Sequence, residues 1–151
     1  MPDFTTVQSL PVICIPADGV SDAALSDAQR AWLKANAFTG TLGELLALPD
    51  DAGVLAGYAF GLGKPVNRPA LVTGLASAKL RPGTYCLDGD LPDPRMAALG
   101  FKLGAYRFDT FRSSAEPVLL DAGQDRDGEI SALADAAFLA RDLINTPPNV
   151  L

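Results

Sequence analysis

Two short acidic runs carry the side chains of this sequence that are best suited to binding a cation. Asp88, Asp90 and Asp93 stand close together beside a glycine, and carboxylates spaced in this way can hold a hard divalent cation. Residues 125–129 (DRDGE) have the composition of a partial calcium loop. The first run lacks the later bidentate acidic residue of a helix–loop–helix calcium site, and in the second Arg126 separates the acids. Both runs precede expected helices, so we interpret them as turns and helix caps.

Residues 57–64 (GYAFGLGK) invite comparison with a phosphate-binding loop. A Walker loop needs a glycine five positions before its Gly-Lys pair, where this chain has Tyr58, and a hydroxyl residue after the lysine, where it has Pro65. As a dinucleotide fingerprint the stretch lacks its third glycine, because Val66 occupies that position. We interpret these glycines as structural, allowing close packing or a bulge in a strand.

Histidine is absent from the chain, which removes the usual general base and the commonest metal ligand. Catalysis would have to use carboxylates or lysine. The two cysteines, Cys14 and Cys86, lie in apolar stretches, so they are expected as buried free thiols or as one cross-sheet pair.

The composition predicts one folded domain. The 151 residues are 48% hydrophobic and 20% charged, and the net charge is −6. No two of the 12 basic residues are adjacent, so the chain lacks the clustered positive charge that binds nucleic acid. We see no signal peptide and no apolar run long enough for a membrane span, and therefore expect a cytoplasmic location.

Strands are expected where short apolar, β-branched runs are bounded by proline, glycine or aspartate. Two runs around an acidic loop at residues 50–53 predict a hairpin. The expected strands are residues 11–16, 43–49, 54–61, 83–88 and 117–121, with the first and last of them buried. Residues 69–80 suit either a strand or a helix.

Helices are expected over residues 27–36, 94–108 and 129–145. Ser21 or Ser26 would cap the first, and Trp32 would anchor it to the core or lie at a subunit contact. Asp93 would cap the second. The third has apolar residues at helical spacing on one face: Ile130, Leu133, Ala134, Ala137, Phe138 and Ile144.

Lys102 and Arg107 on the second helix could contact a substrate or another subunit. We prefer a solvated helix face, on which Gly100 and Gly104 permit close helix packing. The alternation of strands and helices, with one inserted hairpin, predicts an α/β fold: a three-layer α/β/α domain with a mixed sheet.

Two segments carry a family resemblance. Residues 140–149 (ARDLINTPPN) and 97–108 (AALGFKLGAYRF) closely resemble the inter-domain segment and a helix of the leucyl aminopeptidase (cytosol aminopeptidase) family of metallopeptidases. The resemblance implies a macro-domain-like, non-catalytic N-terminal domain at residues 1–128. Residues 129–151 would form the inter-domain helix and the start of the catalytic domain, with Val150 and Leu151 read as the beginning of a continuing chain.

The inter-domain junction in this reading consists of Asn145, Thr146, Pro147, Pro148 and Asn149. Pro147 and Pro148 end the last helix because neither has a backbone N–H to donate, and Pro147 also favours an extended Thr146.

The resemblance also implies an activity that lies outside this chain. The parent enzyme would be a cytoplasmic hexamer that releases N-terminal residues, often leucine, from peptides, using two divalent ions of zinc or manganese in its C-terminal domain. No residue here matches the family's catalytic, metal or substrate positions, so we assign none, and the domain's role would be subunit assembly and architecture. Two alternatives remain: a stand-alone macro-like module that binds a nucleotide or ADP-ribose, and a small carboxylate enzyme.

Overall fold

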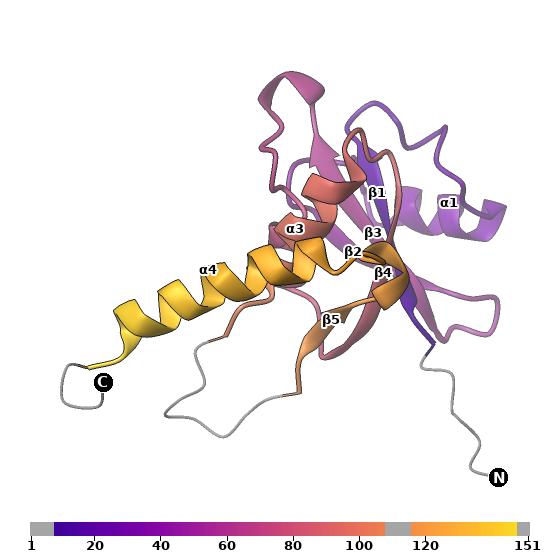
Figure 1. The fold of residues 1–151 in the computed structure, drawn as a ribbon. Helices are drawn as coiled ribbons and strands as arrows, with labels where there is room; N and C mark the ends of the chain where they lie inside the picture. Colours follow the sequence, from indigo (N-terminus) through magenta and orange to yellow (C-terminus); the bar gives the residue numbers. More distant parts are fainter. Residues whose placement is uncertain (1–7, 108–115, 148–151) are drawn as a thin grey trace, which may run out of the picture.

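The computed structural model describes residues 8–107 and 116–147, and its centre is a mixed five-stranded sheet (Figure 1). The strand order is β2-β3-β1-β4-β5, in which only β2 and β3 pair antiparallel. The predicted mixed sheet and hairpin are therefore confirmed. The strands are β1 (Leu10–Pro16), β2 (Leu45–Pro49), β3 (Leu55–Gly63), β4 (Gly83–Gly89) and β5 (Val118–Leu120).

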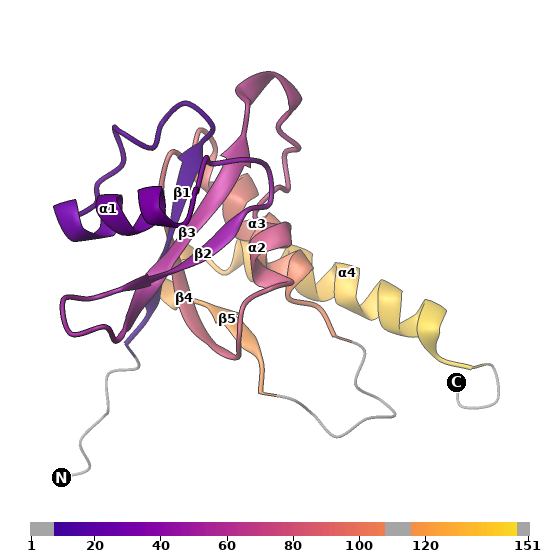
Figure 2. The same cartoon turned by 180° about the vertical axis from the view of Figure 1, so that it is seen from behind.

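Helices cover both faces of this sheet, which gives the three layers expected from the sequence. Figures 1 and 2 show α1 on one face and α2, α3 and α4 on the other. The helices are α1 (Asp27–Ala35), α2 (Gly74–Ser77), α3 (Pro94–Gly104) and α4 (Glu129–Asn145), and short 3-10 turns lie at Pro65–Asn67 and Ala122–Gln124.

Strand alternation divides the core into two clusters. Val12 and Cys14 of β1 point to the side of α2 and α3, while Ile15 points to the side of α1, because successive strand residues face opposite sides. The α1 cluster consists of Ile15, Leu33, Phe38, Leu48 and Ala59. The larger cluster, under α2 and α3, includes Tyr58, Phe60, Leu62, Tyr85, Leu87, Ala97 and Phe101.

Helix α1 begins as predicted, but it is anchored by a different residue. Ser26 and Gln29 form a reciprocal capping box, in which the Ser26 hydroxyl accepts from the backbone N–H of Gln29 at 3.1 Å. Of the two roles that the sequence left open for Trp32, core anchor or subunit contact, the first does not hold: Trp32 is 42% exposed, and its indole N–H donates to the Ala47 carbonyl at 2.9 Å. Leu33, next to it in sequence, is the fully buried anchor.

Gly61 shows why β3 is rich in glycine. A Cβ built on Gly61 would lie 2.0 Å from the Thr41 carbonyl oxygen, so no larger residue fits. Opposite this stretch the register between β1 and β3 shifts between Ile15 and Pro16. The interpretation of these glycines as structural is confirmed: the run allows close packing and an irregularity in the sheet.

One open alternative is decided and one local expectation is revised. Of the strand and the helix that residues 69–80 allowed, a helix forms, but only as the single turn α2 flanked by turns. β5 is an edge strand and not a buried one, since Leu119 is half exposed. Among the helices in the described part of the chain, none has both the length and the hydrophobicity that crossing a bilayer requires.

Candidate functional site

The acidic run at residues 125–129 caps α4. Asp125 accepts the backbone N–H groups of Ile130 at 3.0 Å and Ser131 at 2.8 Å, and also the Ser131 hydroxyl. The hydrogen bond from the Ser131 hydroxyl holds the pKa of the Asp125 carboxyl below its ordinary value. Gly128, at the N-cap position, has no side chain to do this. The sequence-based interpretation of this run as a cap is confirmed.

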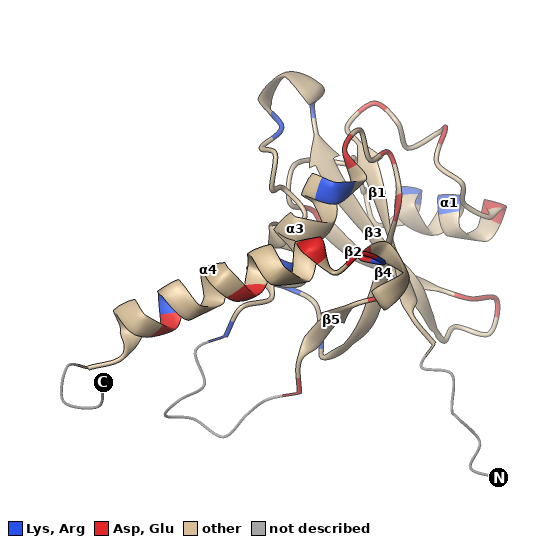
Figure 3. Cartoon of the chain, in the orientation of Figure 1, with Lys and Arg blue, Asp and Glu red and all other residues tan. Residues whose placement is uncertain are grey.

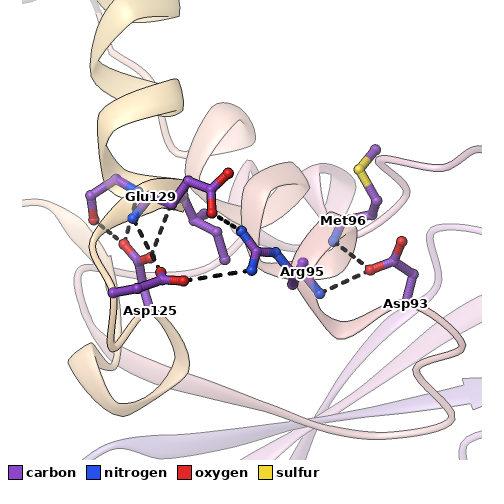
Figure 4. A network of polar contacts seen from close by, with 8 residues as sticks. Asp93, Arg95, Met96, Asp125 and Glu129 are labelled. Carbon is purple, nitrogen blue, oxygen red and sulfur yellow. Dashed lines mark hydrogen bonds and ion pairs between the residues drawn. The ribbon is translucent and has the colours of Figure 1, made fainter.

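A group of side chains that we call the polar clamp joins both ends of α3 to the N-terminus of α4; its α3 members are Arg95 in the first turn, shown in Figure 4, and Lys102 in the last turn. Arg95 of α3 pairs with Glu129 and lies 3.5 Å from Asp127. From the same helix Lys102 donates to the Ser131 hydroxyl at 2.7 Å and lies 3.8 Å from the Asp125 carboxylate. The expectation that Lys102 lies on a solvated face is therefore wrong, because α4 packs over it. The polar clamp links the first turn of α4 to α3.

The first acidic run is also used within the domain. Asp93 caps α3 by accepting the backbone N–H groups of Arg95 and Met96, each at 3.1 Å (Figure 4), as predicted. Asp88 accepts the N–H of the following glycine at 2.7 Å. Asp90 lies 3.4 Å from Arg68. Within residues 8–107 and 116–147, no three His, Cys, Asp or Glu side chains come close enough together to hold a metal ion.

Arg68 is a polar residue that the sequence did not single out. It lines a largely apolar cavity of about 290 Å³ between the segment after β3 and the start of α3. Among the described residues only its Nη1 atom has a hydrogen-bond partner, Asp90, while Nε and Nη2 are buried without an acceptor there. The partners are 22 residues apart in sequence, and no local pattern links them.

Both cysteines are free and unsuited to nucleophilic chemistry. Burial raises the pKa of the Cys14 thiol to about 12, and it also raises the pKa of Cys86. The reactive form of cysteine is the thiolate, so raised values make both side chains poor nucleophiles. The cross-sheet pair that the sequence left open does not form.

The C-terminal end of α3 packs tightly on α2. A Cβ on Gly104 would lie 2.2 Å from the Gly74 carbonyl oxygen, which confirms that Gly104 permits close helix packing. Arg107, beyond the end of α3, donates to the Ala78 carbonyl at 3.3 Å. Arg107 is exposed but ties the ends of α2 and α3 together.

The inner side of α4 is held by an aromatic cluster around Tyr106. The Tyr106 and Phe138 rings lie 5.3 Å apart, and the Tyr106 hydroxyl donates to Asp142 at 2.7 Å. The Arg141 guanidinium lies 5.2 Å from the centre of the Tyr106 ring and donates to the Leu103 carbonyl at 3.0 Å. These contacts extend the attachment of α4 well beyond the polar clamp.

The opposite side of α4, which we call the outer face, is apolar and exposed. Its four large side chains, Leu133, Leu139, Leu143 and Ile144, have exposed fractions between 52% and 83%. The predicted apolar face of α4 is thus divided: Ile130 and Ala134 are buried, whereas Leu133 and Ile144 are not. The outer face consists of Ala132, Leu133, Ala136, Leu139, Ala140, Leu143 and Ile144.

Three junction residues, Asn145, Thr146 and Pro147, lie at the end of this helix and directly after it. α4 ends at Asn145, whose amide donates weakly to the Tyr106 hydroxyl at 3.4 Å. Thr146 has an extended conformation, with φ −80° and ψ 125°, as expected for a residue before Pro147. Pro148 and Asn149 lie outside the described residues.

Comparisons with known proteins agree on one family. Residues 14–120 match the family model described as M17 aminopeptidase, N-terminal domain. A probable cytosol aminopeptidase of Methylobacterium radiotolerans is 34% identical to this chain over a match that covers 76% of this chain and 28% of that protein.

Solved structures give the same result. The cytosol aminopeptidase of Coxiella burnetii superposes with a TM-score of 0.69 at 26% identity, covering 93% of this chain and 32% of that one. The bottromycin maturation enzyme BotP in complex with Mn gives a TM-score of 0.68 at 27% identity, covering 92% of this chain and 32% of BotP. The chain thus spans about a third of the length of these proteins. The alternative of a stand-alone nucleotide-binding module receives no support.

Proposed function

The chain belongs to the family of M17 aminopeptidase N-terminal domains, and from that premise we propose that it is the non-catalytic domain of a metal-dependent leucyl aminopeptidase. The parent protein is a metallopeptidase that releases N-terminal residues from peptides by hydrolysis. This domain has a structural role and contributes to subunit assembly. The observation that carries the proposal is the family match over residues 14–120, which takes in most of the sheet from β1 to β5.

The proposed domain boundary lies between β5 and α4. Residues 1–128 form the N-terminal domain, and residues 129–151 form the inter-domain helix and the start of the catalytic domain, with the junction at residues 145–149. Two observations support this division. The family match ends at residue 120, where β5 ends, and α4 begins at Glu129.

The metal ions of the parent enzyme belong to its C-terminal domain in this proposal. Two divalent ions, zinc or manganese, would act there, where a metal polarises the scissile carbonyl and activates water. Support comes from BotP, a structural relative whose structure holds Mn. In the described part of this chain Asp93 and Asp125 cap helices and Asp90 pairs with Arg68, so we assign no metal ligand to the two acidic runs.

The proposed partners are the protein's own catalytic domain, peptide substrates and, in a hexamer, further copies of the enzyme. Nucleic acid is not a proposed partner, because Lys and Arg are scattered over separate elements (Figure 3) and the net charge is −6. Membranes are not proposed partners either. A cytoplasmic location is supported by relatives that are described as cytosol aminopeptidases.

An activity assay tests this proposal. Hydrolysis of leucine p-nitroanilide in the presence of Mn²⁺ should be measured with the 151-residue chain and with the complete gene product side by side. We expect turnover only with the complete protein. Equal turnover by the 151-residue chain, or none by the complete protein, would contradict the proposal.

A further inference from the structure

A cavity at one end of the sheet holds a positive charge that is incompletely paired. The cavity has a volume of about 290 Å³, and Arg68 and Asp90 lie in its wall. The Arg68 side chain is 11% exposed, and among the described residues its Nη1 atom has one partner, the half-exposed Asp90 carboxylate at 3.4 Å. Nε and Nη2 are buried without an acceptor there. A buried charged group that lacks acceptors destabilises the folded state, and a bound partner that supplies them removes this cost.

The cavity lies where α/β sheets commonly bind their ligands. Leu62, close to the end of β3, and Asp90, directly after β4, both line it. β3 and β4 are the two neighbours of β1 and run parallel to it, so the cavity lies at the carboxyl ends of these strands. After β1 the chain builds the β2–β3 side and then crosses to the β4 side, and ligands bind in the crevice at such a point. Figure 1 shows the segment after β3 and the start of α3 at this end of the sheet.

The walls and the charge of the cavity select a class of ligand. Apolar side chains line it, among them Leu62, Val72, Leu91 and Met96. The guanidinium of Arg68 matches a carboxylate, because its parallel N–H groups can donate to both oxygens. The volume is close to the lower end of the range of about 300–1,000 Å³ that is usual for ligand pockets, so the ligand must be small.

We propose that this cavity binds a small carboxylate that bears an apolar group, with Arg68 as the residue that holds the carboxylate. Nε and Nη2 are covered by protein atoms, so binding requires the guanidinium to turn into the cavity. Among the described residues, the only polar contact of the guanidinium that this motion breaks is the 3.4 Å contact with Asp90. The two freed N–H groups then donate to the carboxylate, and the apolar group packs against Val72 and Met96.

Two sources supply this chemistry: a free apolar amino acid and a simple carboxylic acid. Asp90, released from Arg68, would bind the ammonium group of the first. A nucleotide fits less well, because Asp90 and Asp93 both line the cavity and a diphosphate would meet two negative charges. The inference goes beyond the proposed function and does not depend on it.

An NMR titration of the 151-residue chain with isotope-labelled methyl groups tests the proposal. The probes are leucine, isocaproate, which is leucine without its amino group, and isohexanol, the matching alcohol. We expect a carboxylate probe to shift the methyl signals of Val72 and Met96 saturably and to leave those of Leu139 on α4 unchanged. The alcohol should bind about ten-fold or more weakly than isocaproate, because it brings no charge to the guanidinium. Equal binding of alcohol and isocaproate, or no saturable shift with either carboxylate, overturns the proposal.

Two variants test the role of Arg68. Arg68→Gln should weaken the binding of isocaproate about ten-fold or more and leave that of isohexanol unchanged. Asp90→Asn is the matched control, because it keeps the guanidinium, and isocaproate should bind to it at least as tightly as to the unsubstituted chain. Unchanged isocaproate binding by Arg68→Gln, or an equal loss in both variants, contradicts the proposal.

The same data identify the source of the carboxylate. A free amino acid is the ligand if leucine binds more tightly than isocaproate and loses that advantage in Asp90→Asn, whereas tighter binding of isocaproate identifies a simple carboxylic acid. Either result supports the proposal. The backbone amide spectrum shows whether each variant is folded. If Arg68→Gln does not fold, the comparison of isocaproate with isohexanol on the unsubstituted chain still decides.

Discussion

The core under α2 and α3 and the helix α4 use the same kinds of apolar residue in opposite ways. In the core, Tyr85, Phe60 and Phe101 are almost completely buried, and backbone segments approach so closely that glycine is required at Gly104. In α4, the apolar side chains of Leu133, Leu139 and Leu143 remain more than half exposed. The difference shows that the sheet and its helices form a self-sufficient unit, while α4 carries apolar surface that this unit does not use.

The largest expected effect compares one substitution in two helices. Leu33→Ala in α1 removes a fully buried side chain and should lower the free energy of unfolding by about 2–5 kcal/mol. Leu139→Ala in α4 removes a side chain that is 62% exposed and should change it by less than about 0.5 kcal/mol. Urea denaturation of the 151-residue chain measures both. Comparable losses would show that the outer face of α4 is packed within the domain.

A second pair of variants exchanges glycine and alanine in two helices. Alanine is normally the better helix former, but at position 104 we expect it to destabilise the protein. Gly104→Ala should destabilise by about 1–3 kcal/mol, because the new Cβ meets the Gly74 carbonyl at 2.2 Å and α2 must move. Helix propensity alone predicts a gain of about 1 kcal/mol. Ala140→Gly on the outer face has no such contact and should cost only the propensity, about 1 kcal/mol. Denaturation midpoints give both values, and a stabilising Gly104→Ala would disprove the close contact.

The core and the start of α4 should lose stability at opposite ends of the pH scale. In the core, burial raises the pKa of Tyr85 from 10.0 and of Cys14 from 9.0 to about 12 each. Stability from these neutral groups is complete below their ordinary values and is lost as pH rises toward 12. The pKa of Asp125 is lowered, so its contribution is complete above the ordinary carboxyl value of about 3.9 and is lost as pH falls through its lower folded value.

NMR spectra recorded over a pH series measure this difference in pH response for individual residues. Acid should broaden or shift the amide signals of the first turn of α4 before those of β1. In alkali, where exchange with water removes amide signals, the carbon-bound proton signals of β1 and β4 should change first. Simultaneous loss of α4 and β1 signals on acidification would show that Asp125 does not hold α4 separately.

The smallest expected effect is local to the start of α4. Asp125→Asn removes the charged acceptor for Ile130 and Ser131, so hydrogen exchange in the first turn of α4 should accelerate by about ten-fold. Asp88→Asn is the control, because Asp88 accepts only from its neighbouring glycine and should leave exchange in α4 unchanged. Unaltered exchange at Ile130 and Ser131 in the Asp125 variant would show that Asp125 does not cap α4.

Local patterns predicted most of this fold. A proline-bounded apolar run located β1, and an apolar run between Gly83 and Asp88 located β4. An acidic loop located the β2–β3 hairpin, and Ser26 and Asp93 were recognisable as caps because their partners lie two or three residues away. Such signals depend on a few consecutive residues, which the sequence displays directly.

What the sequence left open depends on distant neighbours. The exposure of Trp32, the ion pair between Arg68 and Asp90, and the edge position of β5 are set by which elements pack together. The division of α4 into a buried and an exposed side is of the same kind. Periodicity predicted that α4 is apolar, but Leu133 and Ile130 differ in burial only because α3 covers one side and nothing in the described residues covers the other.

The central claim is that the domain is complete without the outer face of α4, which we expect the rest of the parent enzyme to cover. Replacing Leu139 and Leu143 together by glutamate tests this most directly, with Tm measured in the 151-residue chain and in the complete protein. We predict a shift within about 1 °C in the chain, because both positions are exposed, and a loss of about 5 °C or more in the complete protein, because two charges would be buried. Equal shifts in the two proteins would contradict the claim.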